Sequence, residues 1–253
     1  MGHPPQSALG SAAGGVPDGN IGTVVDLTRD EYKQFHRRRH AMLLELLGRH
    51  VPGKVGRALD AGGGGDVAGL GAVLRGRFAG EVHAVDLGAD VEEGRRQGIR
   101  AVECDIDRQP LPYPDGYFDL VVFASVIEHL YNPAFALAEL ARVTQPGGTL
   151  ILEAPNAVAL GRRLDALLGR NPFEWFNLYN AVQTKARMDH CAVFYTAEEV
   201  EHVLVNRFTI LERRYCMHDA PSWLLKKLVR ELAFRVLPRL ADCFFVAARR
   251  LGG

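Results

Sequence analysis

A short glycine-rich stretch, RALDAGGGGD at residues 57–66, constrains the fold of this chain more than any other segment. Apolar residues run into Asp60, four glycines follow at Gly62 to Gly65, and apolar residues then return at helical spacing. A strand that ends at a carboxylate, a glycine turn and a helix start form the first unit of a nucleotide-binding α/β sheet. Glycine suits such a turn because it adopts unusual backbone angles and lets a ligand approach bare backbone.

A flexible glycine loop without a ligand is the alternative interpretation of this stretch. The position of the loop between a strand and a helix favours a ligand site, as does a carboxylate about twenty residues downstream. Asp66 can cap the following helix. The N-terminal end of that helix carries partial positive charge and attracts an anionic group such as a carboxylate or phosphate.

Composition excludes several classes of protein. The 253 residues are 47% hydrophobic, which is enough for one α/β domain with a sizeable core. Lys plus Arg and Asp plus Glu balance at 30 each, which argues against a dedicated nucleic-acid binder. We expect neither a zinc site nor a disulfide framework, because the cysteines are far apart and form no CxxC pair. They are Cys104, Cys191, Cys216 and Cys243.

The N-terminal residues 1–29 are rich in Gly, Pro, Ser and Ala, and we predict a disordered lead-in there. They lack the basic region and the continuous apolar core of a signal peptide. No apolar run reaches the length needed to cross a bilayer. Together with the cysteine pattern, this predicts a cytoplasmic protein.

Short apolar runs alternate with helical patterns over residues 30–154. The alternation, with two further strands near the end of the chain, predicts a Rossmann-like sheet of seven mostly parallel strands with helices on both faces. The first five strands are predicted near 56–61, 81–87, 100–105, 119–124 and 149–154, and the last near 242–250. Helices are predicted at 30–50, 66–78, 89–97 and 132–143. A HRRRH cluster at 36–40 is a phosphate clamp or, as we favour, a solvated face.

Polar residues stand at the predicted carboxyl ends of four strands: Asp60, Asp86, Asp105 and Ser125. In open α/β sheets ligands bind at this edge. Asp86 suits both hydroxyls of a ribose, its alternative role being a helix cap or a turn. Asp105 and Ile106 suit an adenine, although Asp105 alone is also a common turn former.

The segment FDLVVFASVIEHLYNPAFALAELARVTQPGGTLILEAPN, residues 118–156, resembles the class I S-adenosylmethionine-dependent methyltransferases. LDAGGGG is similar to the LDxGxGxG of that family, VDL to its ribose-binding strand end and CDI to its adenine-contacting position. The resemblance spans about residues 55–215 and departs from the family at Asp66, where a third glycine is usual. It implies a single methyltransferase domain over 30–253, with S-adenosylmethionine as methyl donor and S-adenosylhomocysteine as product. The implied cofactor-binding residues are Asp60, Gly62, Gly64, Asp86, Leu87, Asp105, Ile106 and Ser125.

The family reaction is an in-line displacement at the sulfonium methyl group, so the protein mainly positions reactants and removes a proton. Histidine is the natural base for a hydroxyl acceptor. His129, beside Glu128 after the fourth strand, is the first candidate, and His190 before a late helix is the second. Packing on the following helix is the alternative role of His129. Asn156 reads as a turn residue rather than a substrate contact.

Two inserts are predicted, at about 169–192 and 218–240. Four aromatic residues of the first insert either cover an apolar substrate or pack the insert onto the sheet: Phe173, Trp175, Phe176 and Tyr179. The second insert holds a basic amphipathic helix, 221–240. Such a helix lies on a membrane surface, reaches a lipid-linked substrate, or is an ordinary surface helix.

The function predicted from these features is methylation of a small molecule, at oxygen, on a natural-product, quinone-like or sugar intermediate. One alternative is an NAD(P)-dependent oxidoreductase, since the loop gives GxGxxA from Gly63, but the late segment offers no TyrxxxLys pair. The other is a non-catalytic scaffold. The sequence predicts no metal and no nucleic-acid partner, and it leaves the acceptor and the oligomeric state open.

Overall fold

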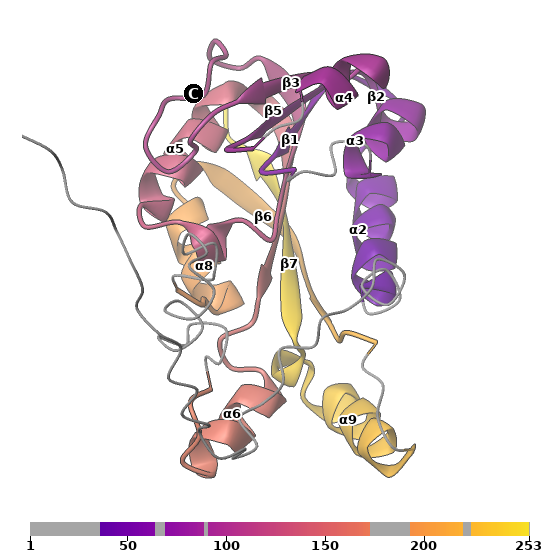
Figure 1. Cartoon of the computed structure of the whole chain (residues 1–253), viewed down its shortest axis with the longest axis vertical. Coiled ribbons are helices and arrows are strands. Elements are labelled where there is room, and N and C mark those ends of the chain that lie inside the picture. The colour runs from indigo at the N-terminus through magenta and orange to yellow at the C-terminus, as the bar shows by residue number, and fades with distance from the viewer. Residues whose placement is uncertain (1–35, 64–68, 89–90, 173–192, 220–223, 253) are drawn as a thin grey trace, which may run out of the picture.

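The computed structural model describes residues 36–63, 69–88, 91–172, 193–219 and 224–252 (Figure 1). The predicted lead-in, Gly64, Asp66, the aromatic cluster and His190 lie outside the described residues. The described strands form a seven-stranded sheet in the order β3-β2-β1-β4-β5-β7-β6. Their bounds are β1 Val55–Ala61, β2 Ala79–Asp86, β3 Arg100–Glu103, β4 Phe118–Ala124, β5 Thr144–Pro155, β6 Phe208–Cys216 and β7 Cys243–Arg250.

The first five strands are parallel, whereas β7 runs antiparallel to both β5 and β6. The predicted Rossmann-like sheet is therefore confirmed. Helices cover both of its faces (Figure 1). They are α2 Arg37–His50, α3 Gly69–Val73, α4 Val91–Arg96, α5 Pro133–Val143, α6 Leu160–Leu167, α8 Ala197–Leu204 and α9 Leu224–Val236, with short helices η1 Leu74–Phe78, η2 Ile127–His129 and η4 Pro238–Leu240.

Two hydrophobic clusters, one on each face, hold the helices to the sheet. Leu46 and Leu47 of α2 are fully buried against residues that include Leu120 of β4. On the other face, Leu140 of α5 packs in a cluster with Phe123 of β4. Strand side chains alternate between the two faces, so every central strand is buried on both sides, as parallel strands usually are.

Several predicted boundaries were wrong. β5 begins at Thr144, five residues before the predicted start at Thr149. The reason is that Thr144 already pairs with Phe118, before the ladder shifts register and resumes at Thr149. β3 ends at Glu103, so Asp105 lies beyond its end. The sequence did not predict α6, whose most apolar residues turn out to be exposed.

Candidate functional site

The carboxyl ends of the central strands bring the predicted site residues to one edge. Asp60 lies beside Ala84 of β2 and Val122 of β4 in the sheet register. Asp86 ends β2, and Ser125 directly follows β4. Asp105 stands two residues past β3.

The glycine turn packs tightly against the end of β4. Gly62 has a φ of +81° and donates its N–H to the carbonyl of Val85 at 2.7 Å. A Cβ atom on Gly62 would come within 2.2 Å of Cγ2 of Val126, which a real side chain does not tolerate. A Cβ atom on Gly63 would lie 2.8 Å from Oδ2 of Asp60. Glycine is thus required at Gly62 both for backbone angle and for space.

Asp60 is a buried acid behind this turn. Its side chain is almost fully enclosed, and burial, together with the nearby charge of Asp86, raises its pKa to about 7. Among the described residues, its Oδ2 atom has no hydrogen-bond partner. A buried carboxyl oxygen without a partner suits a ligand group that carries N–H donors or positive charge.

Asp86 and Leu87 form the next part of the edge. Oδ1 of Asp86 accepts the N–H of Gly88 at 3.0 Å, which is a turn-forming bond. That bond engages one of its two carboxylate oxygens, and a carboxylate accepts several hydrogen bonds. Leu87 leaves 62% of its surface exposed, so an apolar ligand face has room beside it.

Asp105 has the turn role that the sequence also allowed. Its Oδ1 atom accepts the N–H of Asp107 at 3.1 Å, and its Oδ2 lies 3.9 Å from Nε of Arg108. Ile106 is buried in the core cluster. The contacts of Asp105 and Ile106 with an adenine stay predictions.

A polar junction joins the ends of β4 and β5 to α2. Ser125 has a φ of +55°, the left-handed region, which no other non-glycine residue among those described adopts. Its hydroxyl donates to Oε2 of Glu153 at 2.8 Å and accepts a hydrogen bond from Arg39. The Arg39 side chain is therefore part of this largely buried polar junction. The favoured interpretation of the HRRRH cluster as a solvated face was wrong for this residue. Glu153 was not predicted, because it lies inside an otherwise apolar strand.

Glu128 and His129 lie on η2, just past β4. Glu128 is 2% exposed, and burial together with the charge of Glu153 raises its pKa to about 8. Its Oε2 has no hydrogen-bond partner within the described part of the chain. Nε2 of His129 lies 3.9 Å from Oε1 of Glu128, and the His129 side chain is partly exposed. Proton-exchanging groups thus meet at the end of β4.

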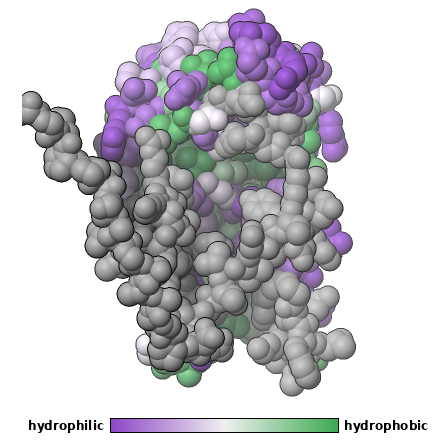
Figure 2. Space-filling model, viewed as in Figure 1, coloured by the Kyte–Doolittle hydropathy of each residue, from purple (hydrophilic) through white to green (hydrophobic). Residues whose placement is uncertain are grey.

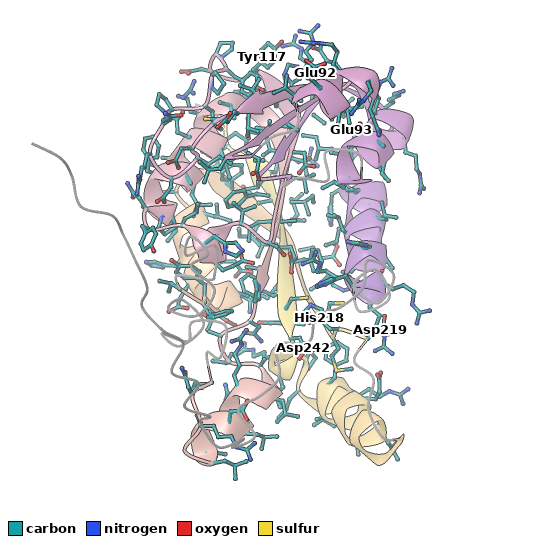
Figure 3. The ribbon with its side chains drawn as sticks, in the orientation of Figure 1. Glu92, Glu93, Tyr117, His218, Asp219 and Asp242 are labelled. Atoms are coloured by element: carbon teal, nitrogen blue, oxygen red, sulfur yellow. The ribbon has the colours of Figure 1, made fainter. Side chains whose placement is uncertain are left out.

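The start of α2 is also tied to the segment before α9. The rings of His36 and His218 meet edge to face at 5.1 Å, and burial lowers the pKa of His36 to about 3. Arg38 pairs with Asp219 at 2.8 Å and with Glu231 of α9 at 2.7 Å. Figure 3 shows His218 and Asp219 in the region between the lower end of the sheet and α9.

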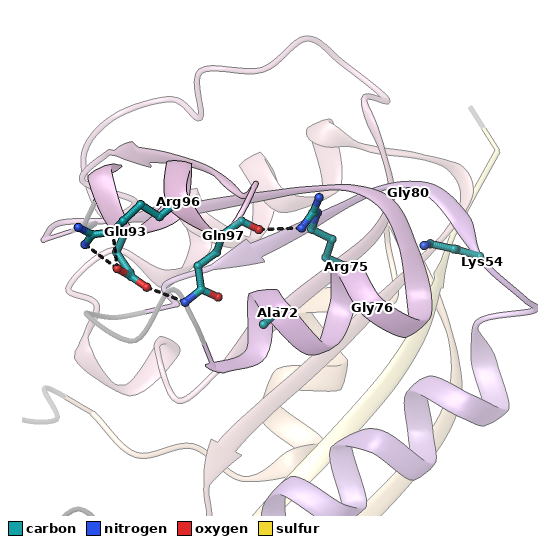
Figure 4. Close-up of a pocket in the computed structure, with 8 residues that line it drawn as sticks. All are labelled: Lys54, Ala72, Arg75, Gly76, Gly80, Glu93, Arg96 and Gln97. Atoms are coloured by element: carbon teal, nitrogen blue, oxygen red, sulfur yellow. Dashed lines mark hydrogen bonds and ion pairs between the residues drawn. The ribbon is translucent and has the colours of Figure 1, made fainter.

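A hollow of about 830 Å³ lies elsewhere, over α3, η1 and α4 (Figure 4). Lys54 and Gly80 on its wall stand at the amino ends of β1 and β2, opposite the candidate site. Glu93 on its wall is engaged by both Arg96 and Gln97 at 2.6 Å. Arg75 donates to the carbonyl of Gln97 at 2.9 Å. These polar groups pair with one another, whereas the carboxyl edge holds the buried Oδ2 of Asp60 without a described partner.

The sheet order, the glycine turn and the acidic ends of β1 and β2 define a nucleotide-binding protein of the Rossmann-like α/β class. Residues 59–152 match the family model described as a methyltransferase domain. A probable S-adenosylmethionine-dependent methyltransferase of Mycolicibacterium smegmatis is 32% identical over 182 residues, which cover 68% of this chain and 66% of that protein. A ubiquinone/menaquinone biosynthesis C-methyltransferase of Cupriavidus necator is 36% identical over 102 residues, 38% of this chain and 42% of the relative.

Solved structures share the fold at low identity. A putative methyltransferase of Haloferax volcanii, solved with a methyltransferase activator, gives a TM-score of 0.61 at 19% identity, covering 88% of this chain and 94% of its own. The N-methyltransferase NodS of Bradyrhizobium japonicum, solved in complex with S-adenosylhomocysteine, gives a TM-score of 0.56 at 18% identity. The match covers 88% of this chain and 93% of that one.

The chain belongs to the class I S-adenosylmethionine-dependent methyltransferases, an enzyme family named for its cofactor. It spans about two thirds of the Mycolicibacterium relative, at 66%, and less than half of the Cupriavidus one.

Proposed function

We propose that this chain transfers the methyl group of S-adenosylmethionine to an oxygen atom of a small molecule. The observation that carries the proposal is the glycine turn wedged between Val126 and Asp60, with the carboxylate of Asp86 on the next strand. The family relationship favours this activity over an NAD(P)-dependent oxidoreductase. The buried, ordered strand ends favour it over a scaffold without a ligand.

The residues at the carboxyl edge fit the cofactor. Gly62 and Gly63 pack so closely on Val126 and Asp60 that a Cβ atom at either position would collide, and glycine exposes bare backbone to a ligand. Asp60 offers a buried carboxyl oxygen to the ammonium group of the methionine part, and Asp86 offers a carboxylate to the ribose hydroxyls. Leu87 offers an apolar surface to the adenosine. When bound, the cofactor supplies a methyl group that is already activated by its sulfonium charge.

The protein's remaining task is to receive the proton of the acceptor. We assign this role to His129, supported by its exposure at the end of β4 and its position beside Glu128. Glu128 is largely protonated near neutral pH, because burial raises its pKa to about 8. His190 stays the second candidate base.

The acceptor class is a natural-product, quinone-like or sugar intermediate, without a nucleic-acid partner. The choice of oxygen rests on the histidine, because the Cupriavidus relative is named as a C-methyltransferase. We place the reaction in the cytoplasm, in keeping with the free, buried thiols of Cys104, Cys216 and Cys243. The exposed leucines of α6 and α9 favour an acceptor that is met at a membrane surface or carried on a lipid.

Isothermal calorimetry with S-adenosylmethionine, S-adenosylhomocysteine and NADH tests the cofactor. Wild type should bind both sulfur compounds, and Asp86→Ala should bind them about 100-fold more weakly, because two hydrogen bonds to a charged group are lost. Glu92→Ala, an exposed acid on α4, is the matched control and should bind like wild type. Binding of NADH alone would overturn the proposal.

Methyl transfer itself is tested with methyl-labelled cofactor and a panel of phenols, quinols and sugars. With the best acceptor, His129→Ala should lower kcat while S-adenosylhomocysteine still binds. His202→Ala, an exposed histidine of α8, is the control and should keep wild-type kcat. Label found only on carbon or nitrogen acceptors would refute the assignment to oxygen.

A further inference from the structure

Two helices carry large apolar side chains that the protein leaves exposed. Leu164, Leu167 and Leu168, on and just after α6, are 49%, 81% and 66% exposed. On α9, Leu228, Leu232 and Val236 are 65%, 62% and 70% exposed. Leu167 and Leu168 lie three and four residues after Leu164, and Leu228, Leu232 and Val236 are four residues apart, so each set lies on one side of its helix. We call these six residues together the apolar rim.

The apolar rim lies at the same end of the molecule as the candidate site. α6 follows the carboxyl end of β5, and α9 leads through η4 into the amino end of the antiparallel β7. Both helices form the lower end of the protein in Figure 1. Figure 2 shows hydrophobic surface at the place that α6 occupies.

Positive charge is concentrated in the same two segments. The whole chain has a formal net charge of zero. Residues 160–170 contain three arginines and one acid, and residues 224–240 contain five Lys and Arg residues and one acid. Both acids are paired with arginines: Asp165 with Arg170 at 3.8 Å and Glu231 with Arg38 at 2.7 Å. The rest of the chain is correspondingly negative.

Exposed arginines flank the apolar rim. Arg163 on α6 and Arg170 just after it are exposed. Arg235 on α9 and Arg239 on η4 are exposed as well, the latter 3.6 Å from Glu198. Large apolar side chains edged by cations are the combination that lets a helix lie in the interface of a bilayer: the apolar side chains enter the acyl boundary and the cations meet anionic headgroups. A protein partner with an apolar patch would need no such excess of arginine.

We propose that the apolar rim and its arginines dock this protein on the surface of an anionic lipid bilayer. The contact is peripheral, since no helix in the described ranges is long and apolar enough to cross a membrane. An ion pair between Arg38 and Glu231 connects α9 to α2. Docking does not depend on methyl transfer. A further step, the entry of a lipid-borne acceptor from this side of the protein, rests on the proposed function.

Vesicle cosedimentation of the full chain tests the docking surface. Wild type should bind phosphatidylcholine vesicles that contain phosphatidylglycerol and not pure phosphatidylcholine, with binding weakened between about 0.1 and 0.5 M NaCl. Leu228→Asp/Leu232→Asp and Leu164→Asp/Leu167→Asp should each weaken partitioning into vesicles at least about tenfold, because two leucines that would enter the bilayer are lost and two anions are added.

Val203→Asp/Val205→Asp is the matched control, with two apolar residues 40% and 49% exposed on and next to α8. It should bind vesicles like wild type. Thermal melting and S-adenosylhomocysteine binding verify that every variant is folded. If wild type does not bind S-adenosylhomocysteine, that result counts against the proposed cofactor and not against the docking surface. No vesicle binding by wild type, or equal binding by the rim variants, overturns the proposal. So does a wild-type dimer, seen by light scattering, that the rim variants convert to a monomer while vesicles stay unbound.

Discussion

Arg39 of α2 and Glu153 of β5 form a buried ion pair, with Nη1 and Oε2 3.6 Å apart. The Glu153 side chain is 1% exposed and that of Arg39 15%. Ser125 lies between them in the hydrogen-bond network, accepting from the arginine and donating to the acid. This pair connects the helix that precedes β1 to the strand ends where the candidate site lies.

Arg39→Ala should therefore destabilise the fold strongly. Removing one partner of a buried pair leaves the other charge without compensation, which costs about 3–5 kcal/mol. Arg37 lies two residues earlier, is 72% exposed and stands 3.6 Å from Asp219, so Arg37→Ala should cost less than about 1 kcal/mol. Urea unfolding of both variants measures the contrast. Adding Glu153→Gln to Arg39→Ala should restore part of the loss, and strict additivity of the two changes would contradict the coupling.

The contact of Gly62 with Val126 gives a second prediction. Gly62→Ala should destabilise the fold by about 2–4 kcal/mol, combining a strained positive φ with a steric overlap. Gly53→Ala separates the two effects, since Gly53 has a φ of +70° but open space around it. It should cost only about 1 kcal/mol.

Val126→Ala in the Gly62→Ala background should recover part of the stability, because both clashing methyl groups belong to that valine. Thermal melting of Gly62→Ala, Gly53→Ala and the double variant measures this. A Gly62→Ala protein as stable as Gly53→Ala would show that the loop relaxes away from β4.

Asn156 follows the end of β5 and is fully buried. The sequence favoured a turn residue, and the structure confirms it: Oδ1 of Asn156 accepts the N–H of Val158 at 3.2 Å. Its Nδ2 also donates to the carbonyls of Arg239 at 2.8 Å and Ala241 at 2.9 Å, which the sequence did not predict. Asn156→Ala should cost about 2–4 kcal/mol, because these buried bonds are lost. Asn156→Asp should cost more at pH 8 than at pH 5, since it turns an ionisable acceptor toward two carbonyl oxygens. A loss of stability in Asn156→Asp, relative to wild type, that is the same at pH 5 and pH 8 would contradict the assigned bonds.

The local sequence pattern predicted those parts of the site that lie within one strand–turn–helix unit or at a strand end. The glycine turn, Asp60 and Asp86 follow from the strand–turn–helix order, because parallel strands share one carboxyl edge. Arg39 and Glu153 could not be predicted, since their pairing joins residues 114 positions apart through the packing of α2. The exposed ridge of α6 was missed for a similar reason: only the fold shows which leucines remain uncovered.

Glu128 gives a prediction about pH, because its pKa is about 8 in the folded protein against an ordinary 4.5. Below pH 4.5 the side chain is neutral in both states and its titration has no effect on stability. Between 4.5 and 8 the folded protein keeps the proton that the unfolded chain releases, so rising pH lowers the free energy of unfolding, by at most about 1.4 kcal/mol per pH unit. Above pH 8 both states are ionised and the slope ends.

Glu128→Gln removes this titration while keeping the shape of the side chain. Its free energy of unfolding, relative to wild type, should therefore rise steadily from pH 5 to pH 8, and urea unfolding across this range measures it. Asp60, whose pKa of about 7 produces a slope of the same sign, is present in both proteins and cancels in the difference. For the control Glu92→Gln, an exposed position on α4, the free energy of unfolding should change with pH in parallel with that of wild type. Parallel curves for Glu128→Gln and wild type would mean that Glu128 is ionised in the folded state, and that the end of β4 carries a negative charge rather than a proton.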